Sequence, residues 1–246
     1  MIKDGIKLSD STVRSYLMIG QSNMAGRGEF CDVEPIRNPL CYVLRMGRWQ
    51  PMSEPINPDR PIFEGLYHSG ISLAASFADE VAIEIGSKVG LIPCADGGTC
   101  IDEWMPGGIL YDHALMMTKL AMRTSAFSGI IWHQGENDCL DDGMARAHKE
   151  KFIAMITSLR RDLGNDRIPV IIGELSENMN DGVDLGNRRM IINRQYYEVA
   201  KEIPACDVVS AKGLSLKPDG IHFDSVSLRE FGRRYARAYL KIAISE

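Results

Sequence analysis

The chain has 246 residues, a length that favours one α/β domain with long loops over two small domains. It carries 28 Lys and Arg against 33 Asp and Glu, a net charge of −5, without any dense basic run, which argues against nucleic acid as a partner. The apolar runs are too short to span a bilayer, and the first five residues lack the apolar core of a signal peptide, so we expect a cytoplasmic protein without a membrane partner.

Apolar, β-rich runs alternate along the chain with helical periods. The strand candidates, in chain order, are Val13 to Ile19, Val89 to Ala95, Gly129 to His133, Ile168 to Leu175 and Asp207 to Ser210. The helical stripes are Leu73, Phe77, Val81 and Ile85; Phe152, Met155, Ile156, Leu159 and Leu163; and Leu228, Phe231, Tyr235, Ala238 and Ile242, the last capped by Ser225 or Ser227. The alternation predicts a three-layer α/β/α sandwich around a central, mostly parallel sheet of five strands.

One segment does not follow this alternation of strand and helix patterns. Residues 27–68 contain six prolines and little periodicity beyond a short run from Cys41 to Met46, so we expect mostly loop there. No repeat or linker divides the rest, which predicts a single domain over 1–246 with a long loop insertion at about 27–68. The six cysteines are scattered without a metal-ligand spacing, so we expect reduced thiols and no zinc site.

The first candidate for chemistry follows the first strand. Gly20-Gln21-Ser22-Asn23-Met24 forms a strand-to-helix junction at the carboxyl end of a parallel strand, where ligands bind. A helix N-terminus there offers unpaired N–H groups to an oxyanion beside Ser22. Alternatively, Ser22 is only a helix cap, and the segment is not a GxSxG elbow because Met24 replaces the second glycine.

The second candidate lies just before the last helix. Asp219-Gly220-Ile221-His222 places a carboxylate three residues before a histidine in a stretch that reads as loop. A serine hydroxyl needs an imidazole to take its proton, and the imidazole needs an acceptor at its other nitrogen. The pair is suited to both roles, although a lone DxxH is also ordinary turn chemistry.

Two further strand ends carry glycine and polar side chains. Asp96-Gly97-Gly98-Thr99 follows one strand, where paired glycines allow backbone N–H groups to approach a ligand; a simple turn is the alternative. Gln134-Gly135-Glu136-Asn137 follows another, and its amides are candidate donors to a developing alkoxide or members of a polar loop.

Together these segments resemble the SGNH or GDSL hydrolase superfamily, and more closely its branch of sialate O-acetylesterase-like and acetylxylan esterase-like proteins, carbohydrate esterase family six. The matching segments are Gly20 to Met24, Gly97 to Thr99 with Ile101 to Trp104, Trp132 to Glu136, and Asp219 to His222. The resemblance implies a flavodoxin-like SGNH hydrolase fold and a serine esterase that removes O-acetyl groups from a carbohydrate, of the acetylated xylan or sialic acid type, without metal or cofactor.

The resemblance also implies residue roles. Ser22 matches the nucleophile, His222 the general base and Asp219 the carboxylate that orients it. The oxyanion donors match the backbone N–H groups of Ser22 and Gly98 with the side chain of Gln134, or of Asn137 as the alternative. The expected substrate pocket comprises Gln21, Trp104, His133 and Glu136; Glu136 is also interpretable as a buried acceptor and His133 as a satisfied strand-end histidine. Cys100 stands where a serine is expected.

Three other functions are compatible with parts of the pattern. The same triad could act on a lipid, thioester or aryl ester, or the chain could be a glycan-binding relative without turnover. A flavodoxin-like nucleotide binder would use Gly97-Gly98-Thr99 as a phosphate loop, but no Walker lysine follows. An intact set of Ser22, Asp219 and His222 favours the esterase.

Overall fold

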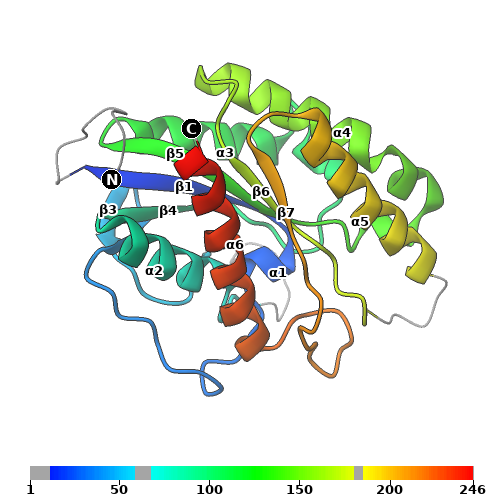
Figure 1. The fold of residues 1–246 in the computed structure, drawn as a ribbon, viewed down its shortest axis with the longest axis horizontal. Helices are drawn as coiled ribbons and strands as arrows, with labels where there is room; N and C mark the ends of the chain where they lie inside the picture. Colours follow the sequence, from blue (N-terminus) through cyan, green and yellow to red (C-terminus); the bar gives the residue numbers. More distant parts are fainter. Residues whose placement is uncertain (1–11, 59–67, 180–184, 246) are drawn as a thin grey trace.

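Seven strands form one sheet in a computed structural model that describes residues 12–58, 68–179 and 185–245 (Figure 1). In chain order they are β1 (Val13–Gly20), β2 (Cys41–Arg45), β3 (Arg48–Pro51), β4 (Val89–Pro93), β5 (Ser125–His133), β6 (Val170–Gly173) and β7 (Cys206–Val209). Their order across the sheet is β3-β2-β4-β1-β5-β6-β7, and every neighbouring pair is parallel except β2 and β3. The predicted α/β sandwich with a mostly parallel sheet is confirmed, but the strand count of five is wrong.

The two additional strands lie inside the proline-rich segment. β2 pairs in parallel with β4, and β3 turns back antiparallel at the edge of the sheet through Met46 and Gly47, both with positive φ. Trp49 of β3 packs directly over Gly90 of β4. Strands of four and five residues next to prolines show too little alternation to be recognised, and an edge strand tolerates the proline that ends β3.

Helices cover both faces of the sheet (Figure 1). One face carries α1 (Ser22–Ala25), α2 (Leu73–Ile85) and α6 (Ser225–Ser245), and the other carries α3 (Ile109–Met122), α4 (Asp142–Leu163) and α5 (Leu185–Glu202). The helical stripes predicted α2, α4 and α6 but not α3 or α5. Within the described residues no helix is long and apolar enough to cross a membrane.

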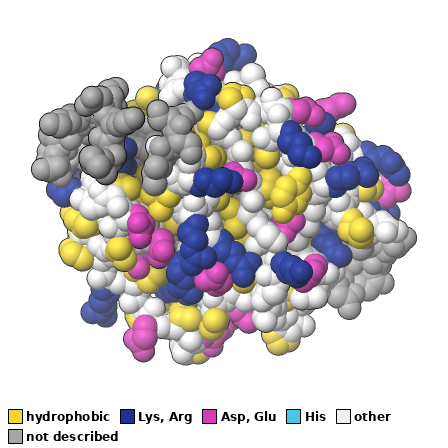
Figure 2. All heavy atoms as spheres, in the orientation of Figure 1, with side chains coloured by type: hydrophobic (Ala, Val, Ile, Leu, Met, Phe, Trp, Pro, Cys, Tyr) yellow, Lys and Arg dark blue, Asp and Glu magenta, His cyan; other side chains and the backbone are white. Residues whose placement is uncertain are grey.

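β1 is buried on both of its faces. Tyr16 and Met18 contribute to the core beneath α2 and α6, whereas Leu17 and Ile19 contribute to the core beneath α3, α4 and α5. The outer face of α6 is polar, and Figure 2 shows Lys and Arg interleaved with Asp and Glu there. A doubly covered parallel sheet explains why β1 is a continuous apolar run.

The start of α6 differs from the predicted cap. The Asp224 carboxylate accepts from Ser227 N at 2.7 Å, so Asp224 caps the helix and neither Ser225 nor Ser227 does. Instead the Ser225 hydroxyl donates to Glu29 O, 3.1 Å away, and lies 2.9 Å from Asp32 Oδ2. The first residue of α6 is therefore tied to the segment that follows α1.

Gly20 ends β1 under a steric constraint that predicts a strong mutational effect. Its φ is +129°, and a Cβ there would lie 2.0 Å from His133 O. We expect Gly20→Ala to lower the free energy of unfolding by about 3 kcal/mol or more, because β1 and β5 cannot separate without losing their ladder. Gly86→Ala is the control: its φ is +60° with open space around it, and the expected loss is about 1–2 kcal/mol. Equal losses in urea unfolding would contradict the steric argument.

Candidate active site

The carboxyl ends of β1, β4 and β5 meet the loop before α6 at a single cavity. Backbone hydrogen bonds continue past the strand ends, with Gln21 N donating to His133 O at 2.9 Å and Asp96 N to Gly20 O at 2.8 Å. The cavity has a volume of about 420 Å³. Of the predicted site residues, it is lined by Gln21, Ser22, Gly98, Asn137 and His222.

Ser22, His222 and Asp219 lie in one hydrogen-bonded line at this cavity. The Ser22 Oγ is 2.9 Å from His222 Nε2, and His222 Nδ1 is 2.9 Å from Asp219 Oδ2. Ser22 is 6% exposed, and the ring of His222 remains partly open to solvent. The structure thus brings together three side chains that are separated by up to 200 residues along the chain.

The carboxylate of Asp219 is held by three donors. Partial burial raises its pKa, but the backbone N–H groups of His222 and Ile221 and the His222 ring donate to it, and together they bring the pKa below its ordinary value. Both backbone bonds are 2.9 Å long. Asp219 is therefore an ionised acceptor facing one nitrogen of the imidazole, which leaves the other nitrogen facing Ser22.

The backbone around Ser22 supplies further polar groups. Ser22 is the first residue of α1, whose cap position is Gln21 without a side-chain capping bond, so the Ser22 hydroxyl is not a helix cap. A residue at this position has a backbone N–H without an intrahelical acceptor. Gly98 lines the same cavity.

Gln134 and Asn137, the alternative third donors, occupy different environments. Gln134 is fully buried and does not line the cavity, and its amide nitrogen already donates to Thr99 O and Asp138 Oδ2. An amide nitrogen has two hydrogens, so none is left for a ligand. Asn137 lines the cavity, and its amide donates to Gly98 O at 2.6 Å, which uses one of its two hydrogens. The geometry therefore favours Asn137 over Gln134.

Gln134 belongs to a buried network behind the cavity. The backbone carbonyl of Gln134 accepts from Tyr196 OH at 2.6 Å, and the same hydroxyl is 2.9 Å from His148 Nε2. Asp138, fully buried, accepts from Ile101 N at 3.2 Å. The network joins the loops after β4 and β5 to α4 and α5, so Gln134 fixes the backbone of the loop that carries Asn137.

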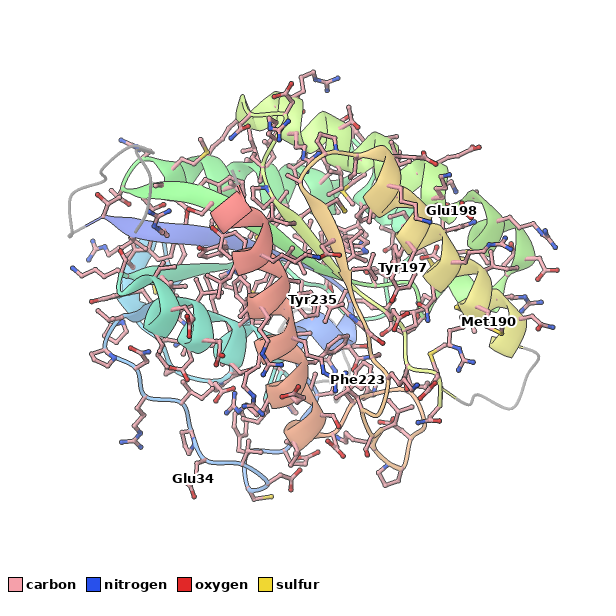
Figure 3. The ribbon with its side chains drawn as sticks, in the orientation of Figure 1. Glu34, Met190, Tyr197, Glu198, Phe223 and Tyr235 are labelled. Carbon is pink, nitrogen blue, oxygen red and sulfur yellow. The ribbon has the colours of Figure 1, made fainter. Side chains whose placement is uncertain are left out.

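Three of the four residues predicted to line the pocket do not reach it. Trp104 is 1% exposed, donates from Nε1 to Thr99 Oγ1 at 3.1 Å and packs against Trp132, so it is a core residue and not a stacking platform for a sugar. His133 is fully buried beneath Phe223 and near Tyr235, two residues labelled in Figure 3. These two predictions are corrected: His133 is a buried strand-end histidine whose Nδ1 lies 3.3 Å from Tyr235 OH.

Glu136 is also buried behind the cavity, where it serves as an acceptor. Its Oε1 accepts from Asn23 Nδ2 at 2.6 Å and lies 3.3 Å from His133 Nε2. Burial raises its pKa, but His133 and the hydrogen bonds outweigh burial and lower the pKa below its ordinary value. With its amide nitrogen turned inward, Gln21 donates to Glu136 Oε2 at 3.1 Å. Glu136 thus holds both chain neighbours of Ser22 and is not a pocket-lining residue.

Part of the cavity lining was not predicted from the sequence. This part consists of Pro58 and four polar residues: Arg27, Asn57, Ser69 and Asp96. Asn57 is bonded to both backbone groups of Ala95, at 3.0 and 3.1 Å, which fixes the proline-rich segment onto the end of β4. A Cβ on Gly97 would lie 2.5 Å from Arg27 Nη2, so a side chain at this position would displace the guanidinium.

The positions of these residues explain why they were missed. Asp96 and Arg27 adjoin the recognised motifs, and that position could have identified them. Asn57 and Ser69 lie beside no recognised motif, so the sequence carries no signal for them.

Searched across 12–58, 68–179 and 185–245, the chain contains no group of three or more His, Cys, Asp or Glu arranged to hold a metal ion.

One protein family matches nearly the whole chain. The family described as "Carbohydrate esterase, sialic acid-specific acetylesterase" matches residues 12–241. A "probable carbohydrate esterase" of Arabidopsis thaliana is 31% identical over 245 residues, which span 92% of this chain and 89% of that protein.

Solved structures share the fold. An X-ray structure of an Arabidopsis thaliana protein superposes with a TM-score of 0.82 and 26% identity, covering 94% of this chain and 98% of that one. The crystal structure of NanS superposes with a TM-score of 0.77 and 17% identity, covering 97% of this chain and all of NanS. Because the family profile spans nearly the whole sequence, the chain belongs to the carbohydrate esterase family of sialic acid-specific acetylesterases.

Proposed function

We propose that this protein is a serine esterase that removes O-acetyl groups from a carbohydrate, of the acetylated xylan or sialic acid type, through an acyl-serine intermediate. The observation that carries the proposal is the line from Ser22 Oγ to His222 Nε2 and from His222 Nδ1 to Asp219 Oδ2, each contact 2.9 Å long, at the wall of a cavity. Membership of an acetylesterase family supports it. A glycan-binding relative without turnover would not need this arrangement.

The first half of the reaction forms the acyl-enzyme. His222 takes the Ser22 proton as the hydroxyl oxygen attacks the ester carbonyl, and Asp219 stabilises the resulting imidazolium. The tetrahedral oxyanion is held by the backbone N–H groups of Ser22 and Gly98 and by the remaining amide hydrogen of Asn137. The sugar hydroxyl then leaves with the proton from His222, and the acetyl group stays on Ser22.

The second half restores the enzyme. A water molecule gives its proton to His222 and attacks the acetyl carbonyl in the same oxyanion site. Collapse of this second intermediate breaks the bond to Ser22 Oγ, which regains its proton from His222, and acetate leaves. The two halves need no group beyond the triad, the oxyanion donors and water.

The rest of the cavity lining fits a carbohydrate better than a long acyl chain. Arg27, Ser69 and Asp96 are hydrogen-bonding side chains suited to sugar hydroxyls, whereas both amide hydrogens of Asn57 are already donated to Pro58 O and Ala95 O. Short apolar side chains, among them Ala25 and Ala95, line the cavity and leave room for a sugar ring and a small acyl group. A volume of about 420 Å³ lies within the range of ordinary small-ligand pockets.

Removal of the nucleophile is the primary test. We expect Ser22→Ala to lower kcat for p-nitrophenyl acetate by about 10⁴-fold or more, because the triad acts as a unit. Ser176→Ala, which removes another buried serine hydroxyl outside the cavity, is the matched control and keeps nearly full activity. Mass spectrometry after treatment with a fluorophosphonate is expected to find the label on Ser22 alone.

The substrate class is tested in the same assay. We expect acetyl esters to be cleaved faster than longer acyl esters, and acetylated xylan or O-acetyl sialic acid to release acetate. Near-normal rates in Ser22→Ala, or labelling at another residue, would overturn the proposed nucleophile. Faster cleavage of long-chain esters than of acetylated sugars would favour a non-sugar esterase.

The third oxyanion donor is tested by comparing two amides. We expect Asn137→Ala to lower kcat by roughly 10²–10³-fold with little change in KM, because the lost hydrogen bond acts in the transition state. Gln134→Ala is expected to lower the melting temperature more than Asn137→Ala, because it removes a side-chain donor to the buried Asp138 carboxylate and leaves only weaker contacts there. A larger loss of kcat in a folded Gln134→Ala enzyme would reverse the assignment.

The pH dependence tests the base. We expect kcat/KM to fall in acid with a slope of one, because only neutral imidazole can take the Ser22 proton. The pKa of Asp219 is held below its ordinary value, so its carboxylate stays charged at every pH above that lowered pKa. Asp219 therefore takes up no second proton while kcat/KM falls. A limiting slope of two in the pH profile of kcat/KM would mean that Asp219 titrates together with His222.

A further inference from the structure

One amide side chain next to the nucleophile in the sequence binds the loop that carries His222 on both sides of the histidine. Asn23 Oδ1 accepts from Phe223 N at 3.0 Å, and Asn23 Nδ2 donates to Ile221 O at 3.3 Å. These are the backbone groups on either side of His222. Because Asn23 follows Ser22 in α1, one helical turn fixes the positions of both the hydroxyl and the imidazole.

The orientation of this amide is set from behind by Glu136. The carboxylate is an acceptor only, and its Oε1 lies 2.6 Å from Asn23 Nδ2, so the amide nitrogen must face it. With the nitrogen fixed there, the Asn23 oxygen is left to face Phe223 N. A flipped amide would place oxygen against oxygen at Glu136 and nitrogen against nitrogen at Phe223.

The chain of contacts is buried and is not used by the proposed chemistry. Asn23 is 1% exposed and Glu136 6% exposed, and neither lines the cavity. The loop has other supports: Lys217 N donates to His222 O at 2.7 Å, and the Phe223 ring packs against Phe231. Of these supports, only Asn23 links the loop to the helix that bears the nucleophile.

We propose that Asn23, oriented by the Glu136 carboxylate, is the positioning residue that holds the His222 imidazole in line with the Ser22 hydroxyl. Glu136 takes no proton in the reaction and acts only as the acceptor that orients Asn23. The inference rests on the proposed function, because it assigns the amide a role through the general base of that mechanism.

A double-mutant cycle tests whether Asn23 acts through His222. We expect Asn23→Ala to lower kcat for p-nitrophenyl acetate by roughly 10²-fold with less than about a threefold change in KM, as a small misplacement of the base would. In a His222→Ala background the same change is expected to cost less than about threefold, because the group it positions is gone. An equal loss in both backgrounds would overturn the proposal.

Asn193→Ala is the matched control. Asn193 brackets both backbone groups of Leu175, at 2.9 and 3.0 Å, in a different loop outside the cavity. We expect this variant to keep its kcat although it loses two equivalent hydrogen bonds. If His222→Ala itself is as active as the unmodified enzyme, the proposed function fails, whatever Asn23→Ala does.

A second pair of variants keeps the test decisive if Asn23→Ala does not fold. Glu136→Gln retains an oxygen that accepts from Asn23, so we expect it to keep kcat within about tenfold, whereas Glu136→Ala loses roughly 10²-fold. Equal, large losses in folded Glu136→Gln and Glu136→Ala would show that the carboxylate charge itself is needed and would overturn the positioning role.

Discussion

The position of β1 between β4 and β5 is the constraint on which the rest of the structure depends. β1 is hydrogen-bonded on both sides, and the bonding continues past its end, where Asp96 N reaches Gly20 O and Gln21 N reaches His133 O. The loops that follow β1, β4 and β5 are therefore held side by side at the same edge of the sheet. Only a residue without a side chain fits at Gly20, so the close approach of the strands and the turn that presents Ser22 have the same cause.

The loop that carries Asp219 and His222 is positioned by α6, the helix that follows it. This helix packs against α2 over the sheet, and its first residue is bonded to the segment after α1 through the Ser225 hydroxyl. Tyr235 reaches from α6 to Trp132 O at 2.8 Å and secures the helix to the end of β5. The loop before α6 consequently has little freedom, and the 200-residue separation between Ser22 and His222 is closed by packing on both sides of that loop.

The sequence predicted the parts of the molecule whose physical signal is local. Apolar runs identified the five strands that are covered on both faces, and the strand ends identified the loops that meet at the cavity. α3 was missed because apolar side chains also occupy its outer face, with Ile109 83% and Met116 66% exposed, which blurs the helical stripe. The choice between Gln134 and Asn137 depended on which amide already had partners. That depends on tertiary contacts of Thr99 and Asp138, which no spacing in the sequence reveals.

The residues assigned to the proposed reaction and the residues that line the rest of the cavity come from different parts of the chain. Ser22 and the loops that carry Gly98 and Asn137 follow strand ends, where backbone geometry leaves few alternatives, and Asp219 and His222 lie in the loop before α6. Arg27, Asn57 and Pro58 of the cavity lining come from the proline-rich segment. This segment is held to the fold by Asn57 on Ala95, and by Glu54 in a buried, two-bonded ion pair with Arg229 of α6. Between such anchors a loop can change sequence without disturbing β1, β4 or α6. Substitutions at Arg27 or Pro58 can therefore change the lining of the cavity while Ser22, Asp219 and His222 keep their positions.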